Sequence, residues 1–158
     1  MTKTKLHIIS FDVPYPADYG GVIDVFYKIK SLAAQGVEIY LHCFQYGRAE
    51  AEVLEQYCKA VYYYPRKTGL QGLSLTLPYM LYSRRDEQLL QNLLAIDAPI
   101  MFEGVHTCYL LQHPSLSERK KIVRNHNVEQ EYYALLAKRE KSIFKKIYFR
   151  IEARLLKN

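Results

Sequence analysis

The sequence predicts an α/β fold, a Rossmann-like open parallel sheet with helices on both faces, and three observations support this prediction. Apolar runs of strand length alternate along the chain with longer segments of helical period, which is the pattern of repeated strand–helix units. The first apolar run, KLHIISF at 5–11, lacks the alternation of a half-exposed strand and therefore suits a strand covered on both faces. With 158 residues, 49% hydrophobic and 24% charged, the chain has the composition of a folded protein and the length for one core. We therefore expect a single domain over 1–158.

The N-terminal part of the chain predicts a strand, a helix and a second strand. The strand at 5–11 leads into a loop with two prolines that ends in a glycine pair, and these residue types reverse the chain. From Gly21, apolar residues recur at helical spacing until Gly36, a plausible glycine C-cap. The run VEIYLHCF at 37–44 predicts the second strand.

The middle of the chain predicts a helix and a strand, followed by a segment without a clear period. Residues 48–59 carry apolar side chains on one helical face, and AVYYY at 60–64 predicts the third strand. Pro65 stops that strand, because proline lacks the amide that a sheet ladder needs. The segment 69–82 is apolar but poorly periodic, so no element is predicted there.

Two more strands are predicted before the terminal helix. Asp86 can cap a helix that runs through Ile96, because an aspartate side chain can accept from the first free amides of a helix. The runs PIMFEGV at 99–105 and KIVRN at 121–125 predict the fourth and fifth strands, with a short helix near Tyr109 between them.

The last predicted helix, about 128–157, is amphipathic and basic. Asn127 followed by Gln130 resembles a capping box, which marks the start of a helix. From residue 138 onward there are eight Lys and Arg against two Glu, so this segment carries the whole net charge of +6. At helical spacing one apolar stripe is formed by Leu136, Ile143, Ile147, Ile151 and Leu155. Two interpretations stay open: the stripe packs on the domain with the lysines solvated, or the helix lies on an anionic membrane surface.

The cysteines and the apolar runs indicate in which cellular compartment the protein is expected. Cys43, Cys58 and Cys108 are odd in number and show no metal-ligand spacing, so neither a disulfide framework nor a zinc site is predicted. No secretory signal is visible, and no apolar stretch approaches the roughly 20 residues of a membrane span. We expect a cytoplasmic protein that binds no metal, with a peripheral position at the inner face of the membrane as the alternative that the basic helix allows.

Open α/β sheets bind ligands outside the carboxyl ends of their strands, where the strand order reverses. With right-handed crossovers and the order 3-2-1-4-5, that point lies between the first and fourth strands. The loops after the first, fourth and fifth strands therefore hold the candidate site residues. These are Asp12, Gly20, Gly21, Glu103, His106 and His126. His7 and His42 lie within predicted strands and are expected to be satisfied interior residues.

The candidates differ in the chemistry they can supply. Gly20 and Gly21 stand at the start of the first helix, where free amides favour a phosphate, although the pair can equally serve only to turn the chain. The loop has neither a GxGxxG nor a P-loop pattern, and the second strand does not end in a carboxylate for a ribose, which argues against a nicotinamide cofactor. His126 is the strongest catalytic candidate, because the end of the fifth predicted strand places its imidazole on this rim, although it can also be only the residue that precedes a helix cap. Glu103 and His106 can form a carboxylate–imidazole pair that accepts a hydroxyl proton or binds a sugar, or they can belong to a solvated loop.

Two stretches of the chain carry a family resemblance. The first is FDVPYPADYGGVIDVFYKIKSLAAQGVEIYLHCF at 11–44, and the second is RNHNVEQEYYALLAKREKSIFKKIYFRIEARL at 124–155. The first looks like the opening of glycosyltransferase family 4, with its strand, proline-containing loop, glycine pair, helix and second strand. The second is similar to the corresponding part of bacterial sugar transferases of that family.

The resemblance implies a GT-B enzyme, a retaining hexosyltransferase in which two Rossmann-like domains face each other and no metal or other cofactor is bound. In that family the N-terminal domain mostly holds the acceptor, while the C-terminal domain holds the nucleotide-sugar and supplies a pair of glutamates. Carried over by position, Gly20 and Gly21 would approach the donor phosphate, and His126 would lie near the transferred sugar. The acceptor-side residues would be Asp12, Glu103 and His106.

The sequence ends at Asn158, before the donor-binding C-terminal domain of that family. We therefore expect an acceptor-side domain of a transferase for polysaccharide biosynthesis, inactive alone because half a cleft cannot position donor against acceptor. Its expected substrates are a nucleotide-sugar donor and a glycan or lipid-linked acceptor, and no nucleic acid is expected.

Two other function classes stay open. One is a non-catalytic module that binds anions or nucleic acid through the basic helix, although the 15 tyrosines do not alternate with basic residues as a stacking surface would. The other is a complete small Rossmann enzyme acting on a nucleotide or methyl donor, for which the cofactor fingerprint is missing.

Overall fold

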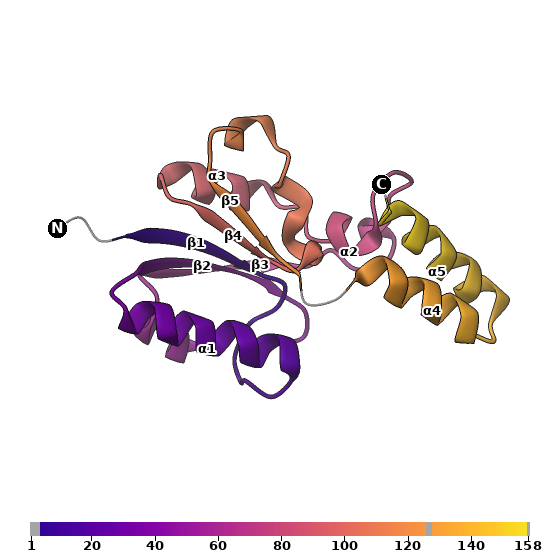
Figure 1. The fold of residues 1–158 in the computed structure, drawn as a ribbon, viewed down its shortest axis with the longest axis horizontal. Coiled ribbons are helices and arrows are strands. Elements are labelled where there is room, and N and C mark those ends of the chain that lie inside the picture. Colours follow the sequence, from indigo (N-terminus) through magenta and orange to yellow (C-terminus); the bar gives the residue numbers. More distant parts are fainter. Residues whose placement is uncertain (1–3, 126–127, 158) are drawn as a thin grey trace.

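Within the described residues, 4–125 and 128–157, five parallel strands form one sheet. The structure is a computed structural model, and its strand order is β3-β2-β1-β4-β5 (Figure 1). The strands are β1 (Lys5–Ser10), β2 (Glu38–Gln45), β3 (Ala60–Pro65), β4 (Ile100–Glu103) and β5 (Lys121–Arg124). Both the predicted α/β fold and the predicted strand order are confirmed.

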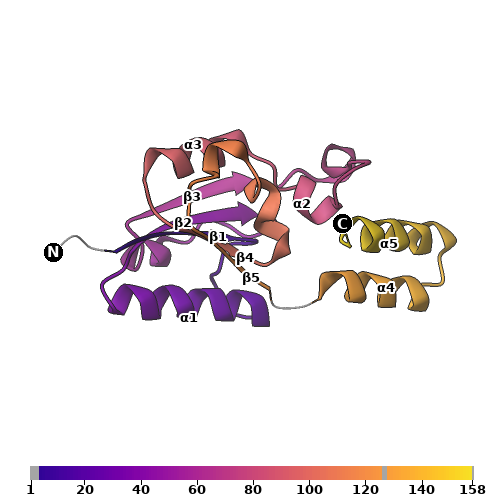
Figure 2. The same cartoon turned by 45° about the horizontal axis from the view of Figure 1, so that its top comes forward.

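Helices cover both faces of this sheet. The long helix α1 (Gly20–Ala34) lies along one face and α3 (Glu87–Ala95) along the other (Figure 2). Short 3-10 helices occur in the connections: η1 (Glu52–Gln56), η2 (Gly69–Gly72), η3 (Val105–Leu110) and η4 (Pro114–Leu116). Asp86 caps α3 as predicted, because its carboxylate accepts from the amides of Gln88 and Leu89 at 2.9 and 3.2 Å.

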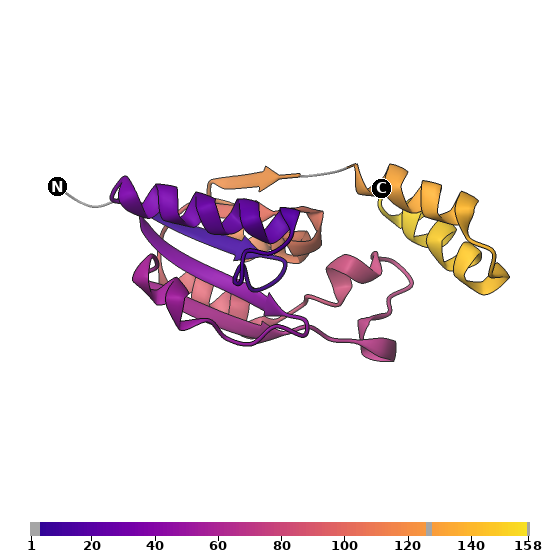
Figure 3. The ribbon, with the colours of Figure 1, turned by 90° about the horizontal axis from the view of Figure 1, so that it is seen from below.

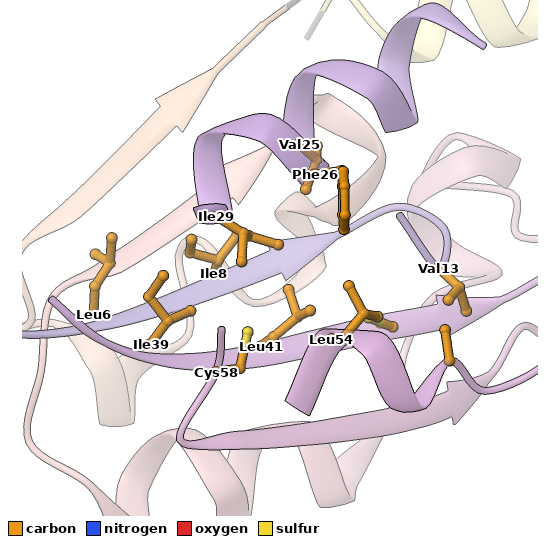
Figure 4. Close-up of a cluster of buried hydrophobic side chains, with 12 residues drawn as sticks. Leu6, Ile8, Val13, Val25, Phe26, Ile29, Ile39, Leu41, Leu54 and Cys58 are labelled. Carbon is orange, nitrogen blue, oxygen red and sulfur yellow. The ribbon is translucent and has the colours of Figure 1, made fainter. Parts of the chain in front are cut away.

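The hydrophobic core has one part on each side of the sheet. Toward α1, Ile8 and Leu41 of the strands meet Val25 and Ile29 of the helix and Leu54 of η1 (Figure 4). The part toward α3 contains Ile9, Phe44, Leu89, Leu93 and Phe102. Neighbouring side chains of β1 are thus buried on opposite faces, which is why the strand shows no polar alternation.

A chain of hydrogen bonds crosses the sheet on the α3 side. His7 Nε2 lies 3.0 Å from the Ile96 carbonyl oxygen, His7 Nδ1 lies 2.9 Å from His42 Nε2, and His42 Nδ1 lies 2.8 Å from the Tyr64 hydroxyl. That hydroxyl in turn accepts from the Asn92 amide at 2.8 Å. Because a carbonyl can only accept, neutral His7 carries its proton on Nε2, so His42 donates to His7 and accepts from Tyr64. Both imidazoles are satisfied interior groups, as predicted.

The segment 69–82, for which no element is predicted, forms η2 and the single-turn helix α2 (Tyr79–Tyr82). The buried side chain of Arg84 ties this segment to the loop after β1. Its Nε donates to the Phe11 carbonyl at 3.2 Å, and its Nη1 donates to the Met80 carbonyl at 2.8 Å. Burial lowers the pKa of Arg84 to about 9, so the guanidinium remains a cation at neutral pH.

The helix predicted at 48–59 is wrong, because this segment contains only the short η1. The chain enters it through Gly47, whose φ is +81°, and is still extended at Ala51. The Ala51 amide donates to the Tyr63 hydroxyl at 3.1 Å, a bond that a longer helix would break. One turn is enough to bury Leu54 completely.

The single terminal helix predicted at about 128–157 is also wrong. Two helices occupy this segment, α4 (Glu129–Arg139) and α5 (Ile143–Leu155). Between them the Glu140 backbone is extended, and its carboxylate accepts from the amides of Lys141 and Ser142 at 2.8 and 2.9 Å. In a continuous helix those two amides would donate to carbonyls four residues earlier, so the carboxylate makes the break possible.

After this break α5 runs back alongside α4, and the helical hairpin projects beyond the carboxyl ends of the strands (Figure 3). The Tyr133 ring packs against the Phe149 ring with the centroids 5.9 Å apart. The apolar stripe predicted for one continuous helix is therefore divided between two antiparallel helices. Asn127, part of the predicted capping box, lies outside the described residues.

Candidate functional site

A pocket of about 510 Å³ opens at the carboxyl edge of the sheet, where the strand order predicts the ligand site. It is bordered by the ends of β1, β4 and β5 and by the first turns of α1 and α4. Side chains and backbone of these five elements meet there, among them Phe11, Gly20, Gly21, His106, Asn125 and Tyr132. The structure therefore brings three predicted residues together in one pocket, Gly20, Gly21 and His106.

The glycine pair forms the first turn of α1. A Cβ at Gly20 would meet no atom within 4 Å, whereas a Cβ at Gly21 would lie 2.6 Å from Cζ of Phe11. Glycine at position 21 thus lets the Phe11 ring close one wall of the pocket. The first amides of a helix have no intrahelical acceptor, and the first turn of α1 holds no acidic side chain. This end of the 15-residue helix can therefore receive an anion.

His106 reaches the pocket from the loop after β4. Gly104 turns the chain there with a φ of +77°, a backbone conformation that residues other than glycine rarely adopt. Its amide donates to the Arg124 carbonyl at 2.7 Å. The His106 ring packs against the Phe11 ring with the centroids 5.7 Å apart. The imidazole is thus held against an aromatic wall of the pocket, where it can meet a hydroxyl group of a ligand.

Glu103, the last residue of β4, is fully buried and belongs to a network of charged side chains. Its carboxylate accepts a hydrogen bond from Nζ of Lys28 on α1, and its other oxygen lies 3.9 Å from Nη1 of Arg124. Arg124 also donates to both carboxylate oxygens of Asp24. Glu103 is not among the described residues that line the pocket, and its pairing with His106 as an acceptor-binding unit stays a prediction.

Asp12 is buried in the loop after β1 and orients Tyr19, which borders the pocket. Its carboxylate accepts from the Val13 amide at 2.8 Å and from the Tyr19 hydroxyl at 3.2 Å, and lies 3.6 Å from Nε of Arg48. Burial and the neighbouring Asp12 charge raise the pKa of Tyr19 to about 12, so its hydroxyl stays protonated. Asp12 thus acts on the pocket through Tyr19.

His126, the predicted catalytic residue, lies outside the described residues. Asn125, which precedes it in the chain, lines the pocket at the end of β5. The role of His126 therefore stays a prediction.

Sequence reasoning missed two charged residues of α1, Asp24 and Lys28, which pair with Arg124 and Glu103. Their spacing of four residues on a predicted helix is a weak signal for an ion pair, and their nitrogen–oxygen distance is 3.2 Å. Nothing in the sequence indicates that Lys28 reaches a carboxylate 75 residues away.

Three further features bear on function in the part of the chain that the structure describes: possible metal ligands, cysteines and possible membrane-spanning helices. No three His, Cys, Asp or Glu side chains there are grouped so as to hold a metal ion. The three cysteines are buried and free, and burial raises the pKa of each thiol, so they stay protonated at neutral pH. Across 4–125 and 128–157, none of the helices has the length and apolar character to cross a bilayer.

The chain is similar to a known protein along most of its length. The chain is 30% identical over 152 residues to an uncharacterized 44.6 kDa protein in the cps region of Klebsiella pneumoniae. The match covers 92% of this chain and 39% of the relative, so the chain spans about two fifths of the relative's length. No family model matches the chain, and no solved structure matches it significantly.

Proposed function

We propose that this chain is the N-terminal, acceptor-side domain of a retaining glycosyltransferase that moves a sugar from a nucleotide-sugar to a glycan or lipid-linked acceptor. The observation that carries the proposal is the meeting of Gly20, Gly21 and His106 in one pocket, with Asn125 beside it. The same four positions belong to, or lie between, the two stretches that resemble glycosyltransferase family 4. The relative encoded in a capsule (cps) region supports a role in polysaccharide biosynthesis.

In the proposed reaction, the candidate residues act on the leaving group, on the transferred sugar and on the acceptor. The first amides of α1 at Gly20 and Gly21 stabilise negative charge on the departing nucleoside diphosphate. His126 orients the transferred sugar and shields the positive charge that develops on it. His106, held against the Phe11 ring, meets a hydroxyl of the acceptor. As in the family that the chain resembles, the transfer is proposed to need no bound metal.

The remaining part of the donor site is proposed to come from a second domain facing this pocket. Positioning donor against acceptor supplies much of the rate in a two-substrate transfer. We therefore expect residues 1–158 alone to show no measurable turnover, whereas the product of the complete reading frame should consume a nucleotide-sugar.

The test is a turnover assay on the product of the complete reading frame. It is incubated with a panel of nucleotide-sugars and a lipid extract as acceptor source, and release of nucleoside diphosphate is measured. His126→Ala should lower turnover by about 100-fold, the size of effect seen when one stabilising group is removed from an active site. His113→Ala is the matched control, because His113 lies in the loop before η4 and does not line the pocket.

One result would contradict the proposed activity, and another would contradict only the proposed role of His126. If no nucleotide-sugar is consumed by the folded protein, the transferase assignment fails. If His126→Ala and His113→Ala both leave turnover unchanged, His126 is removed from the site while the transferase assignment stands.

A further inference from the structure

Four apolar side chains of α5 face outward. Ile143, Ile147 and Ile151 follow one another at intervals of four residues and are 72, 49 and 53% exposed, and Phe144 is 87% exposed. A surface helix normally turns such a stripe toward the core. Here the stripe lies on the outer side of the hairpin, with no covering element among the described residues.

The opposite side of α5 fixes this orientation. Ala153 and Glu152 are buried, and the Phe149 ring packs against Tyr133 of α4. The Glu152 carboxylate accepts from the Tyr79 amide at the start of α2, at 2.9 Å. Rotating α5 to bury the isoleucines would expose Ala153 and break these contacts. The contacts of its opposite side therefore keep the isoleucines exposed.

The same outer face is positively charged. At about 100° per residue, Arg150 and Arg154 lie beside Ile147 on α5, and both arginines are exposed. From residue 138 onward eight Lys and Arg stand against two Glu. Of those two glutamates, Glu152 points away from this face and is buried. Exposed isoleucines and arginines are therefore interleaved on one helix surface, which we call the outer face of α5 (Ile143, Phe144, Ile147, Arg150, Ile151 and Arg154).

We propose that the outer face of α5 binds the surface of an anionic lipid bilayer. Apolar side chains on such a helix enter the boundary between head groups and acyl chains, while arginines pair with lipid phosphates. A second copy of the chain is a poorer occupant, because it would bring two basic surfaces together. The phosphates of a nucleic acid would pair with the arginines, but its bases stack on aromatic side chains and would not cover the exposed isoleucines.

The hairpin also connects this face to the pocket. Glu129 and Tyr132 in the first turns of α4 line the pocket, and α4 packs along α5 (Figure 2). Binding of the outer face would therefore hold the pocket close to the bilayer. The inference stands independently of the proposed transferase activity, although a lipid-linked acceptor would be reached most easily from such a position.

The test is co-sedimentation of the product of the complete reading frame with lipid vesicles. Vesicles of phosphatidylcholine alone are compared with vesicles that contain 30% phosphatidylglycerol, at low and at high salt. We expect binding only to the phosphatidylglycerol vesicles and weaker binding at high salt, because salt screens the charges.

Two double variants separate the apolar from the charged contribution. Arg150→Gln with Arg154→Gln should weaken binding by about 25-fold, at about five-fold for each charge. Ile147→Ser with Ile151→Ser should weaken it by about ten-fold or more, because buried apolar area is lost. All four side chains are exposed, so both variants should keep the circular dichroism spectrum of the parent chain.

Matched controls come from the opposite end of the sheet. Lys5→Gln with Lys59→Gln removes two exposed charges near the amino ends of β1 and β3, and Leu94→Ser removes an exposed apolar side chain from α3. Neither change should alter vesicle binding by more than about two-fold.

Several outcomes would overturn the inference. These are no binding of the folded product of the complete reading frame to anionic vesicles, equal binding to neutral vesicles, or equal losses in the control variants. If the outer-face variants instead abolish self-association in ultracentrifugation, or binding to an RNA oligonucleotide, while vesicles are not bound, the occupant is a second copy or a nucleic acid and the proposal is wrong.

Discussion

Nζ of Lys28, in the middle of α1, donates a hydrogen bond to the carboxylate of Glu103, at the last residue of β4. The Glu103 side chain is fully buried and the Lys28 side chain is 18% exposed. This pair joins the helix to the strand one residue before Gly104, which lines the candidate pocket. A buried carboxylate without its cation would be costly, so the pair couples the position of α1, and of the glycines at its start, to the end of the sheet.

Breaking this pair should destabilise the fold. Lys28→Met leaves the Glu103 carboxylate buried with less compensation, and we expect the unfolding free energy to fall by about 3 kcal/mol. Glu103→Leu should have a similar effect, and the double variant should lose clearly less than the two single losses combined. Urea unfolding measures all three. Single losses below about 0.5 kcal/mol would mean that the pair behaves like an exposed ion pair and would contradict this account.

The histidine chain in the sheet should make stability depend on pH. Burial lowers the pKa of His7 and of His42 below the usual 6.5, whereas the unfolded chain titrates near 6.5. Below that pH the unfolded state binds more protons, so the unfolding free energy falls as the pH falls, by at most about 1.4 kcal/mol per pH unit for each histidine. The stability is complete above about pH 6.5.

The slope of unfolding free energy between pH 7.5 and 5.5 tests this dependence. His42→Gln should reduce the slope even if it also lowers stability at pH 7.5, because one of the two buried groups no longer titrates. His113→Gln removes a histidine that lies outside this chain of hydrogen bonds and serves as the control variant. Equal slopes in the parent chain and the His42 variant would assign the pH dependence to other groups.

The parts of the fold that depend on local signals could be predicted from the sequence. Asp86 is followed by a helix that its side chain caps, and the apolar runs fall on strands whose order follows from general rules of connection. The same rules predict that Gly20, Gly21 and His106 meet, because each comes after the carboxyl end of a strand and these ends lie at one edge of the sheet.

The charged network and the break in the terminal helix were not predicted, because both depend on side-chain contacts that hydrophobic periodicity does not reveal. Lys28 and Glu103 are 75 residues apart, and Asp24 and Arg124 are 100 apart, so the charged network exists only once the sheet has formed. The break at Glu140 arises because a carboxylate bonds to the next backbone amides, a local alternative to the helix. That break decides which way the isoleucines of α5 face, which a single helical wheel over 128–157 cannot show.

Alanine at the two pocket glycines should have opposite effects on stability. Gly20→Ala adds a methyl group that meets no atom within 4 Å, and the helix should gain about 0.5–1 kcal/mol, because alanine has less conformational freedom to lose. Gly21→Ala would place its methyl carbon 2.6 Å from Cζ of Phe11, so the ring must move and the gain should disappear. Thermal unfolding of the two variants measures the difference.

The same pair tests the anion site. If an anion approaches the first amides of α1, the new methyl group of Gly20→Ala should weaken binding of a nucleoside diphosphate by about ten-fold while stability rises. Chemical-shift titration by NMR follows this binding. Unchanged affinity in Gly20→Ala would move the anion site away from the glycine pair, and a loss of stability in this variant would contradict the open space at Gly20.

The contact between Glu152 and the start of α2 should hold the hairpin against the rest of the molecule. The Glu152 carboxylate accepts from the Tyr79 amide at 2.9 Å, so Glu152→Ala leaves that amide without its acceptor and should cost about 1–3 kcal/mol. Glu152→Gln keeps an oxygen acceptor and removes a buried charge, so stability at pH 7 should be retained or increased. Hydrogen exchange of the α5 amides should accelerate in the alanine variant and stay slow in the glutamine variant.

The charge of Glu152 can be tested separately by comparing the parent chain with Glu152→Gln at several pH values. Burial raises the pKa of Glu152 above the usual value, so the folded state binds the proton more tightly than the unfolded state. The unfolding free energy of the parent chain, relative to the glutamine variant, should therefore rise as the pH falls through the raised pKa toward 4.5. A constant difference between the two proteins over this range would show that the carboxylate is solvated, and that α5 is not held by a buried charge at this position.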